Sequence, residues 1–203
     1  VVHHSSMPYQ ELPAFMADLA SRRGYSNQAL LFLILTAART QEVLLMERPQ
    51  ADMDDAVWEV PAEAMKMGRV HYVPLSWQAV ALLDSVRPMA GSSLMFVGMR
   101  GKPMSNDTLM SALKKSGGKG YTVHGMRATF RTWAGDSAEH TMDLADMALS
   151  HKVKGKVRQA YMRGDMFERR RVLMQQWADY CLSLVPSHVE WLKPRGSGQP
   201  SRS

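Results

Sequence analysis

One histidine and one arginine are spaced so that their side chains could bind the same anion. His124 and Arg127 stand in the tetrapeptide His-Gly-Met-Arg. On a helix, side chains at i and i+3 project from one face, so these two groups are expected to converge on a single anion. A surface pair without function would have the same spacing, and the tetrapeptide alone leaves both interpretations open.

A second pair of suitable spacing combines an arginine with a carboxylate. Arg39 follows a strongly apolar segment, and Glu42, three residues later, is spaced to bridge back to its guanidinium group and to orient it. A purely structural ion pair is the alternative. Lys66 lies between two expected strands and His151 near an expected helix start, where a solvated lysine and a cap-region histidine are the ordinary interpretations.

The stretch that surrounds Tyr161 is strongly basic. From residue 152 to residue 171 it contains eight basic residues against Asp165 and Glu168. This concentration of positive charge favours a polyanion such as DNA, although a solvated helix face would also account for it. Within it, the candidates for DNA contact are Lys152, Lys154, Lys156, Arg158 and Arg163.

The elements that must position these residues are read from hydrophobic periodicity. The pattern predicts a mainly α-helical fold with a small antiparallel β-sheet. Helices are expected over residues 12–19, 26–35, 76–86, 107–116, 122–134, 142–149, 153–162 and 167–184, and strands over 57–60 and 69–73, with one further candidate at 94–97. Ser26, Ser76 and Ser105 are the expected N-caps.

Two of the expected helices carry informative faces. The helix beginning at Ser26 is apolar nearly all round, which predicts a buried core helix that delivers Arg39 at its end or in the following turn. The helix at 167–184 has an apolar stripe, and closing the chain's own core is the favoured interpretation of that stripe.

Length and composition limit the class of protein. The chain has 203 residues, a net charge of +6 and a pI near 9.6, which suits one domain with a polyanionic partner. Cys181 is the only cysteine, as expected for a reducing compartment, and the cytoplasm is the expected location. The apolar stretch at 29–38 is far shorter than the roughly 20 residues of a membrane span, and a signal peptide is not evident.

The two ends differ in character from the middle. The chain starts at Val1, and His3-His4-Ser5-Ser6 resembles the remains of a tag, so we expect it to be cut from a longer protein. The expected organisation is a tag or linker remnant at 1–8, one catalytic domain at 9–185 and a tail at 186–203. The tail is rich in Pro, Gly and Ser, although Val189, Trp191 and Leu192 are candidates to dock on the domain.

Several motifs in order resemble those of the phage integrase family of tyrosine recombinases, and in particular the satellite-prophage and genomic-island integrases. The resemblance covers roughly residues 9–184 and rests on the stretches TAARTQEV, MKMGRVHYVPLS, VHGMRATFRTWA, LSHKVKGKVRQAYMR and ERRRVLMQQWADY. Two usual glycines of the family are replaced by Ala37 and Ser150, and we expect those glycines to serve backbone packing. The interval from His151 to Tyr161 is one residue longer than in most members, as in the island subgroup.

The resemblance implies a site-specific DNA recombinase that integrates or excises a mobile element through a 3′-phosphotyrosyl intermediate. Tyr161 would be the nucleophile, and Arg39 and Arg127 would bind the non-bridging phosphate oxygens. His124 would accept the tyrosine proton or bind the phosphate, and His151 would donate to the same group. Lys66 would protonate the departing 5′-hydroxyl oxygen, with Glu42 orienting Arg39. The chemistry requires no metal and no other cofactor.

The resemblance also implies partners and alternatives. The expected partners are double-stranded DNA attachment sites, other copies in a homotetramer on DNA with a monomer when free, an excisionase and a DNA-bending host protein, in the nucleoid of a bacterial host and without a membrane. In this family, the segment after the nucleophile often docks on a neighbouring protomer, which is the alternative interpretation of the last expected helix.

Two alternative functions remain open. The chain could be a non-catalytic basic DNA-binding module or a type IB topoisomerase-like enzyme. His71 and His140 are expected to be surface residues, and the other tyrosines to be packing residues.

Overall fold

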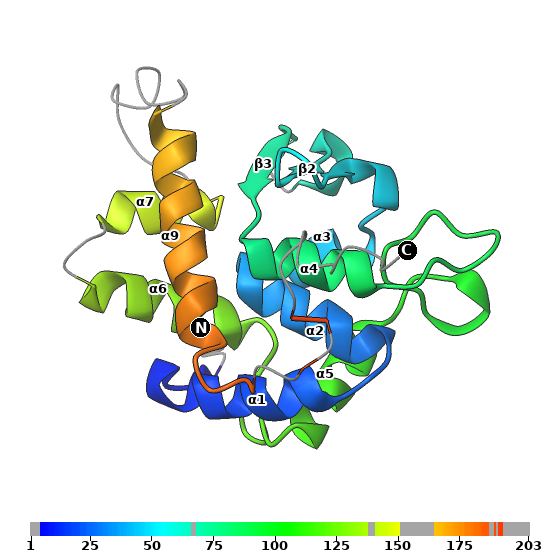
Figure 1. The fold of residues 1–203 in the computed structure, drawn as a ribbon, viewed down its shortest axis with the longest axis horizontal. Coiled ribbons are helices and arrows are strands. Elements are labelled where there is room, and N and C mark those ends of the chain that lie inside the picture. The colour runs from blue at the N-terminus through cyan, green and yellow to red at the C-terminus, as the bar shows by residue number, and fades with distance from the viewer. Residues whose placement is uncertain are drawn as a thin grey trace, which may run out of the picture.

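The computed structural model describes residues 5–65, 68–137, 141–150, 165–186, 189 and 191–192. Eight α-helices and one three-stranded antiparallel sheet make up these parts, so the expected fold class is confirmed (Figure 1). The helices are α1 Leu12–Ser21, α2 Tyr25–Thr36, α3 Thr40–Leu44, α4 Trp77–Ser85, α5 Asn106–Lys115, α6 Gly125–Asp136, α7 Met142–Ala148 and α9 Asp165–Cys181. The expected helix at 153–162 lies outside the described residues.

Helix α2 forms the centre of the hydrophobic core. All residues from Ala29 to Thr36 are buried, and α1, α4, α5 and α9 each contact this helix (Figure 1). A helix that is apolar on every side can be stable only where other elements cover every side, so the prediction from its composition is confirmed. Its N-cap is Gly24 rather than the expected Ser26, because the chain enters the helix with a φ of 107° that favours glycine.

The sheet contains the two expected strands and an unexpected third one. Strand β2 (Val57–Val60) pairs with β3 (His71–Pro74), with Trp58 opposite Val73. The third strand is β1 (Ala51–Asp52), which pairs with β2. The prediction of a strand at 94–97 is wrong, because Leu94 makes only an isolated bridge with Glu47. A two-residue strand is too short to show an alternating pattern, which explains why the sequence did not indicate it.

Helix α9 closes the core of its own chain. The stripe formed by Leu173, Met174, Trp177 and Cys181 is buried, and the indole Nε1 of Trp177 donates to the carbonyl of Ile34 on α2 at 2.8 Å. The rings of Phe130 and Trp133 on α6 lie 5.3 and 5.0 Å from that indole, centroid to centroid. The favoured interpretation of the stripe is therefore confirmed, and these side chains are not available to a neighbouring protomer.

Both ends of the described chain contact the helical domain. The carbonyl of Met7 accepts from the hydroxyl of Thr129 at 2.7 Å, and the carbonyl of Ser5 accepts from the backbone N–H of Thr122 at 3.0 Å. The backbone carbonyls of Ser5 and Met7 thus pair with α6 and with the turn before it. At the other end, the Trp191 indole donates to the carbonyl of Ala20, so the expected docking of Trp191 occurs. The expected domain boundaries stay predictions.

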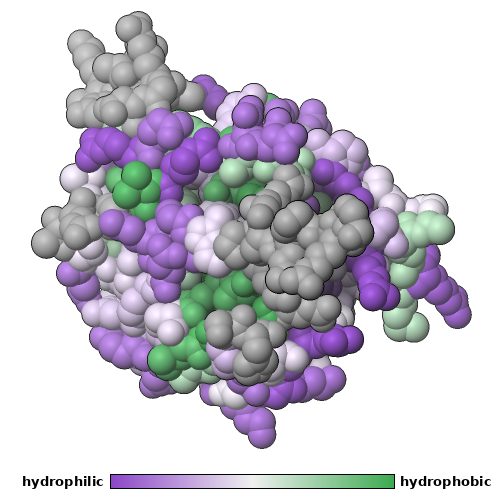
Figure 2. Space-filling view, in the orientation of Figure 1, coloured by the Kyte–Doolittle hydropathy of each residue, from purple (hydrophilic) through white to green (hydrophobic). Residues whose placement is uncertain are grey.

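The surface in Figure 2 is mostly hydrophilic, with hydrophobic residues gathered in small patches. Among the large apolar side chains that are exposed, Trp77 and Val172 lie together along a groove beside α4 and α9. Within the described parts of the chain, every helix is too short or too polar to cross a membrane.

Helix α2 ends in a strained turn. Ala37, its C-cap, has φ 51° and ψ 26°, and Ser150, just after α7, has φ 50°. These are the two positions where the integrase pattern has glycine. Left-handed backbone costs a residue with a Cβ roughly 1 kcal/mol, so the glycines serve this conformation and not only the packing that the sequence suggested.

We predict that Ala37→Gly is more stable than Ala38→Gly by about 1 kcal/mol in urea denaturation. Ala38 is a matched control because it is also buried, follows directly in the chain and has no positive φ. Both substitutions remove one methyl group and free the unfolded chain equally, but only the first relieves strain. Equal stabilities of the two variants would contradict this account.

Candidate active site

Arg39 is positioned by helix α3, an element that the sequence did not indicate. It is the N-cap residue of this five-residue helix, which begins just after the turn at Ala37. Glu42 binds Arg39 twice: Oε2 accepts from the backbone N–H of Arg39 at 2.8 Å, and Oε1 accepts from Nη1 at 2.6 Å. The carboxylate of Glu42 is only 3% exposed, so it holds the guanidinium group from the protein side while Arg39 remains partly accessible.

Arg127 reaches the same place from helix α6. It is buried, and its guanidinium group donates from Nη1 to the carbonyl of Ala37 and from Nη2 to the carbonyl of Leu149 at 2.7 Å. These carbonyls lie at the C-terminal ends of α2 and α7, where backbone oxygens lack helical partners and carry partial negative charge. Two helix ends therefore hold one arginine.

The two arginines meet at the end of α7. Arg39 donates from Nη1 to the hydroxyl of Ser150 at 2.6 Å and from Nη2 to the carbonyl of Leu149 at 3.5 Å, the carbonyl that also binds Arg127. Burial, together with the charge of Arg39, lowers the pKa of Arg127 to about 10, although the charge of Glu42 opposes this shift. Arg127 is still a cation at neutral pH, so two positive charges share one carboxylate.

His124 lies one helical turn before Arg127. It is exposed at the N-cap of α6, which starts at Gly125 and not at Thr122 as expected. In the turn before the helix, the Thr122 hydroxyl accepts from the Gly125 N–H at 3.0 Å. His124 and Arg127 thus lie on the same end of α6, with the histidine towards solvent and the arginine in the interior. This arrangement is compatible with one anion bound between them.

Several predicted residues lie outside the described parts of the chain. They are Lys66, His151 and Tyr161, together with the DNA-contact candidates Lys152, Lys154, Lys156, Arg158 and Arg163 and the histidine His140. The structure brings Arg39, Glu42 and Arg127 together, with His124 nearby on the same helix end as Arg127. The roles of all of these residues remain predictions.

His71 is not the surface residue that the sequence suggested. It is the first residue of β3, is half-buried and shares its strand face with buried Val73. Burial, together with the charges of Arg170 and Arg39, lowers the pKa of its imidazole to about 4, although the charge of Glu42 opposes this shift. The period-two pattern of the strand could have placed His71 on the inner face.

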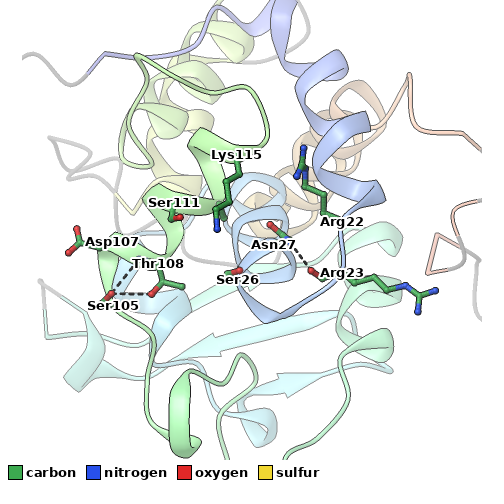
Figure 3. A pocket seen from close by; sticks show the side chains of 10 residues that line it. Arg22, Arg23, Ser26, Asn27, Ser105, Asp107, Thr108, Ser111 and Lys115 are labelled. Atoms are coloured by element: carbon green, nitrogen blue, oxygen red, sulfur yellow. Dashed lines mark hydrogen bonds between the residues drawn. The ribbon is translucent and has the colours of Figure 1, made fainter.

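A polar cleft lies away from this site. Its volume is about 650 Å³, and it lies between the α1–α2 turn and α5, lined among others by Arg22, Asn27, Ser105 and Lys115 (Figure 3). No predicted catalytic residue lines it, and Arg22 is paired with Asp18 at 2.7 Å. The candidate site is therefore the arginine pair and not this cleft. The described residues include no cluster of His, Cys, Asp or Glu side chains suited to a metal ion.

We predict that Glu42→Gln lowers the free energy of unfolding by about 2–4 kcal/mol, because it leaves two neighbouring guanidinium groups without a carboxylate. Urea denaturation measures the change, and Glu59→Gln on the exposed face of β2 is the control, expected to change stability by less than about 0.5 kcal/mol. Sulfate should restore part of the loss as a substitute anion. A Glu42→Gln variant as stable as the control would refute the charge argument.

The lowered pKa of His71 predicts that the free energy of unfolding decreases at acidic pH. The folded chain binds a proton at this imidazole near pH 4, whereas an unperturbed histidine does so near 6.5. Its contribution is therefore complete above pH 6.5 and decreases as the pH falls towards 4, by about 2 kcal/mol at pH 4.5. Urea denaturation of the wild type and of His71→Gln from pH 7.5 to pH 4.5 isolates this part, and parallel curves would contradict the depressed pKa.

Known proteins resemble this chain over most of its length. The model of the phage integrase family matches residues 6–167. Prophage integrase IntZ of Escherichia coli K12 is 36% identical over 95% of this chain and 48% of its own length, and the integrase of Enterobacteria phage P4 is 33% identical over 88% of this chain and 45% of its own. The chain thus spans about half the length of these curated relatives.

Solved structures show the same fold at low sequence identity. A lambda integrase tetramer bound to a Holliday junction superposes with a TM-score of 0.57 at 20% identity, covering 77% of this chain and 49% of that one. The resemblance stated from the motifs is thereby confirmed, since the family match covers residues 6–167, most of the chain. The chain belongs to the phage integrase family.

Proposed function

We propose that this chain is the catalytic part of a site-specific DNA recombinase, which cleaves and rejoins DNA through a covalent 3′-phosphotyrosyl intermediate. The observation that carries the proposal is the convergence of Arg39 and Arg127 on the end of α7 beside one carboxylate. Two guanidinium groups held in fixed orientation suit the non-bridging oxygens of a phosphodiester, where charge increases in the transition state.

The nucleophile of the proposal is Tyr161. A free tyrosine has a pKa of about 10, so only about one in a thousand is ionised at pH 7, and its attack needs a base and a positive field. The tyrosine oxygen would form a bond to phosphorus as the bond from phosphorus to the 5′ oxygen breaks. His124 would take the tyrosine proton, or bind the phosphate, and Lys66 would protonate the departing 5′ oxygen.

Other residues support this step. His151 directly follows Ser150, whose hydroxyl binds Arg39, so a donor at position 151 would enter the site next to that arginine. Glu42 would keep Arg39 oriented between phosphate and protein. The reverse reaction, attack by a 5′-hydroxyl on the phosphotyrosine, would reseal the backbone without ATP, because the covalent bond conserves the phosphodiester energy.

The proposed partner is double-stranded DNA at attachment sites of a mobile element. The net charge of +6 and the basic candidates Lys152, Lys154, Lys156, Arg158 and Arg163 favour such a polyanion. The related lambda integrase was solved as a tetramer on a Holliday junction. By analogy, this chain would form a homotetramer on DNA and be a monomer when free. An excisionase and a DNA-bending host protein are the proposed accessory partners, and the bacterial nucleoid is the proposed location.

We predict that the protein forms a covalent adduct with a nicked suicide substrate that carries its attachment site, and that Tyr161→Phe forms none, because phenylalanine lacks the attacking oxygen. Denaturing electrophoresis of labelled DNA measures the adduct. Tyr25→Phe is the matched control and should retain the adduct, since its hydroxyl donates to the carbonyl of Arg87, which is not part of the site.

The same assay separates the alternatives. Binding without an adduct in the wild type would favour a non-catalytic DNA-binding module and sink the proposal. Adducts on DNA of any sequence, with relaxation of supercoils but no strand exchange, would favour a topoisomerase-like enzyme. Adduct formation should persist in EDTA and without ATP, and a strict requirement for magnesium would contradict the mechanism.

A further inference from the structure

Ser150 provides a second side-chain acceptor for the guanidinium group of Arg39. Its hydroxyl accepts from Nη1 of Arg39 at 2.6 Å, and Oε1 of Glu42 accepts from the same nitrogen at 2.6 Å. A terminal guanidinium nitrogen carries two N–H bonds, so these two acceptors use both of them. One corner of the guanidinium group is thus fully engaged by the protein.

The other edge of this guanidinium group, formed by Nε and Nη2, is held more loosely. Nη2 donates to the carbonyl of Leu149 at 3.5 Å, a distance at which a hydrogen bond is weak. The side chain of Arg39 is also 26% exposed. Because an arginine binds phosphate oxygens best through two parallel N–H groups, this edge is the one suited to a phosphate.

The hydroxyl of Ser150 is carried by a fixed part of the backbone. The N–H of Ser150 donates to the carbonyl of Met147 in the last turn of α7 at 3.0 Å, and its φ is 50°. Helix α7 packs against both α6 and α9, and Arg131 on α6 pairs with Asp146 on α7 at 2.8 Å. The acceptor for Arg39 is therefore positioned by the packing of three helices.

We propose that Ser150 is a positioning residue for the cleavage step: together with Glu42, its hydroxyl holds Nη1 of Arg39 and so presents the edge formed by Nε and Nη2 to the scissile phosphate. The inference rests on the proposed recombinase function. It assigns to Ser150 no contact with DNA. It also gives a reason for a side chain at a position whose left-handed backbone favours glycine.

The physical reason for a second acceptor is that Glu42 alone would permit another orientation of Arg39. A carboxylate and a guanidinium group pair most strongly through two parallel hydrogen bonds. Without the serine hydroxyl, the guanidinium group would be free to turn and to engage Glu42 through its other edge, which would remove the donors that the phosphate needs. A displacement of about 1 Å in a positioning group can cost roughly a hundredfold in rate.

The test uses three substitutions of Ser150 that separate its hydroxyl from its backbone. Ser150→Ala removes the hydroxyl and keeps the strain, whereas Ser150→Gly removes the hydroxyl and relieves the strain. Ser150→Thr keeps the hydroxyl but adds a branch at Cβ, which disfavours positive φ further. Ser93→Ala, at an exposed serine outside the site, is the control. Single-turnover cleavage rates at saturating protein, DNA dissociation constants and urea midpoints are measured for each.

We expect Ser150→Ala and Ser150→Gly each to slow cleavage by about 10-fold or more, with DNA dissociation constants within about threefold of the wild type, as for other groups that support a functional residue. Ser150→Gly should have the higher urea midpoint of the two. Ser150→Thr should cleave within about threefold of the wild-type rate at a lower midpoint than the wild type. Ser93→Ala should match the wild type in every measurement. A purely structural role predicts the opposite order of rates, with the glycine variant fastest and the threonine variant slowest.

Three results would overturn the inference. The first is Ser150→Ala or Ser150→Gly cleaving at the wild-type rate, and the second is Ser150→Thr being as slow as Ser150→Ala. The third is a loss of rate that weaker DNA binding or a smaller folded fraction accounts for. If the wild type and Tyr161→Phe both fail to form an adduct, the proposed function fails and the inference with it, whereas an active wild type with an unaffected Ser150→Gly overturns the inference alone.

Discussion

Two guanidinium groups held beside one carboxylate in a poorly solvated place are the constraint on which this structure depends. Arg39 and Arg127 share the carbonyl of Leu149, and Glu42 is the acid that accompanies them. The charges of these three side chains sum to +1, and burial makes those of Arg127 and Glu42 expensive to leave uncompensated. The backbone oxygens at the ends of α2 and α7 offset part of this cost, and a bound phosphate diester, with its single negative charge, would offset the remainder.

This arrangement explains two of the four described non-glycine positions that have a positive φ. Ala37 must adopt positive φ to turn its carbonyl towards Arg127, and Ser150 must do so where its hydroxyl meets Arg39. Glycine would adopt both conformations at lower cost. The strain is maintained because the buried helix α2 fixes one end and the contacts of α7 fix the other. Each arginine thus depends on elements far away in the sequence.

The helices, the two longer strands and the Arg39–Glu42 pair could be predicted, because periodicity and i,i+3 spacing are local properties. Helix α3 could not, since five residues are too few for a periodic signal. The hydrogen-bond partners of Arg127 could not be predicted either, because they are backbone carbonyls, and every residue carries one. His71 was interpreted as a surface residue because its charged neighbours, Arg170 and Arg39, become neighbours only when β3, α9 and α3 pack together.

Positioning by backbone atoms has a consequence for how such a site tolerates substitution. A carbonyl persists whatever side chain its residue carries, so Leu149 can vary in type as long as α7 ends in the same place. The residues that fix where α7 ends are then under stronger constraint than the residue that binds the arginines. Helices α6 and α9 supply such residues, since both pack against α7. The geometry of the arginine pair is in this way set by the packing of helix against helix.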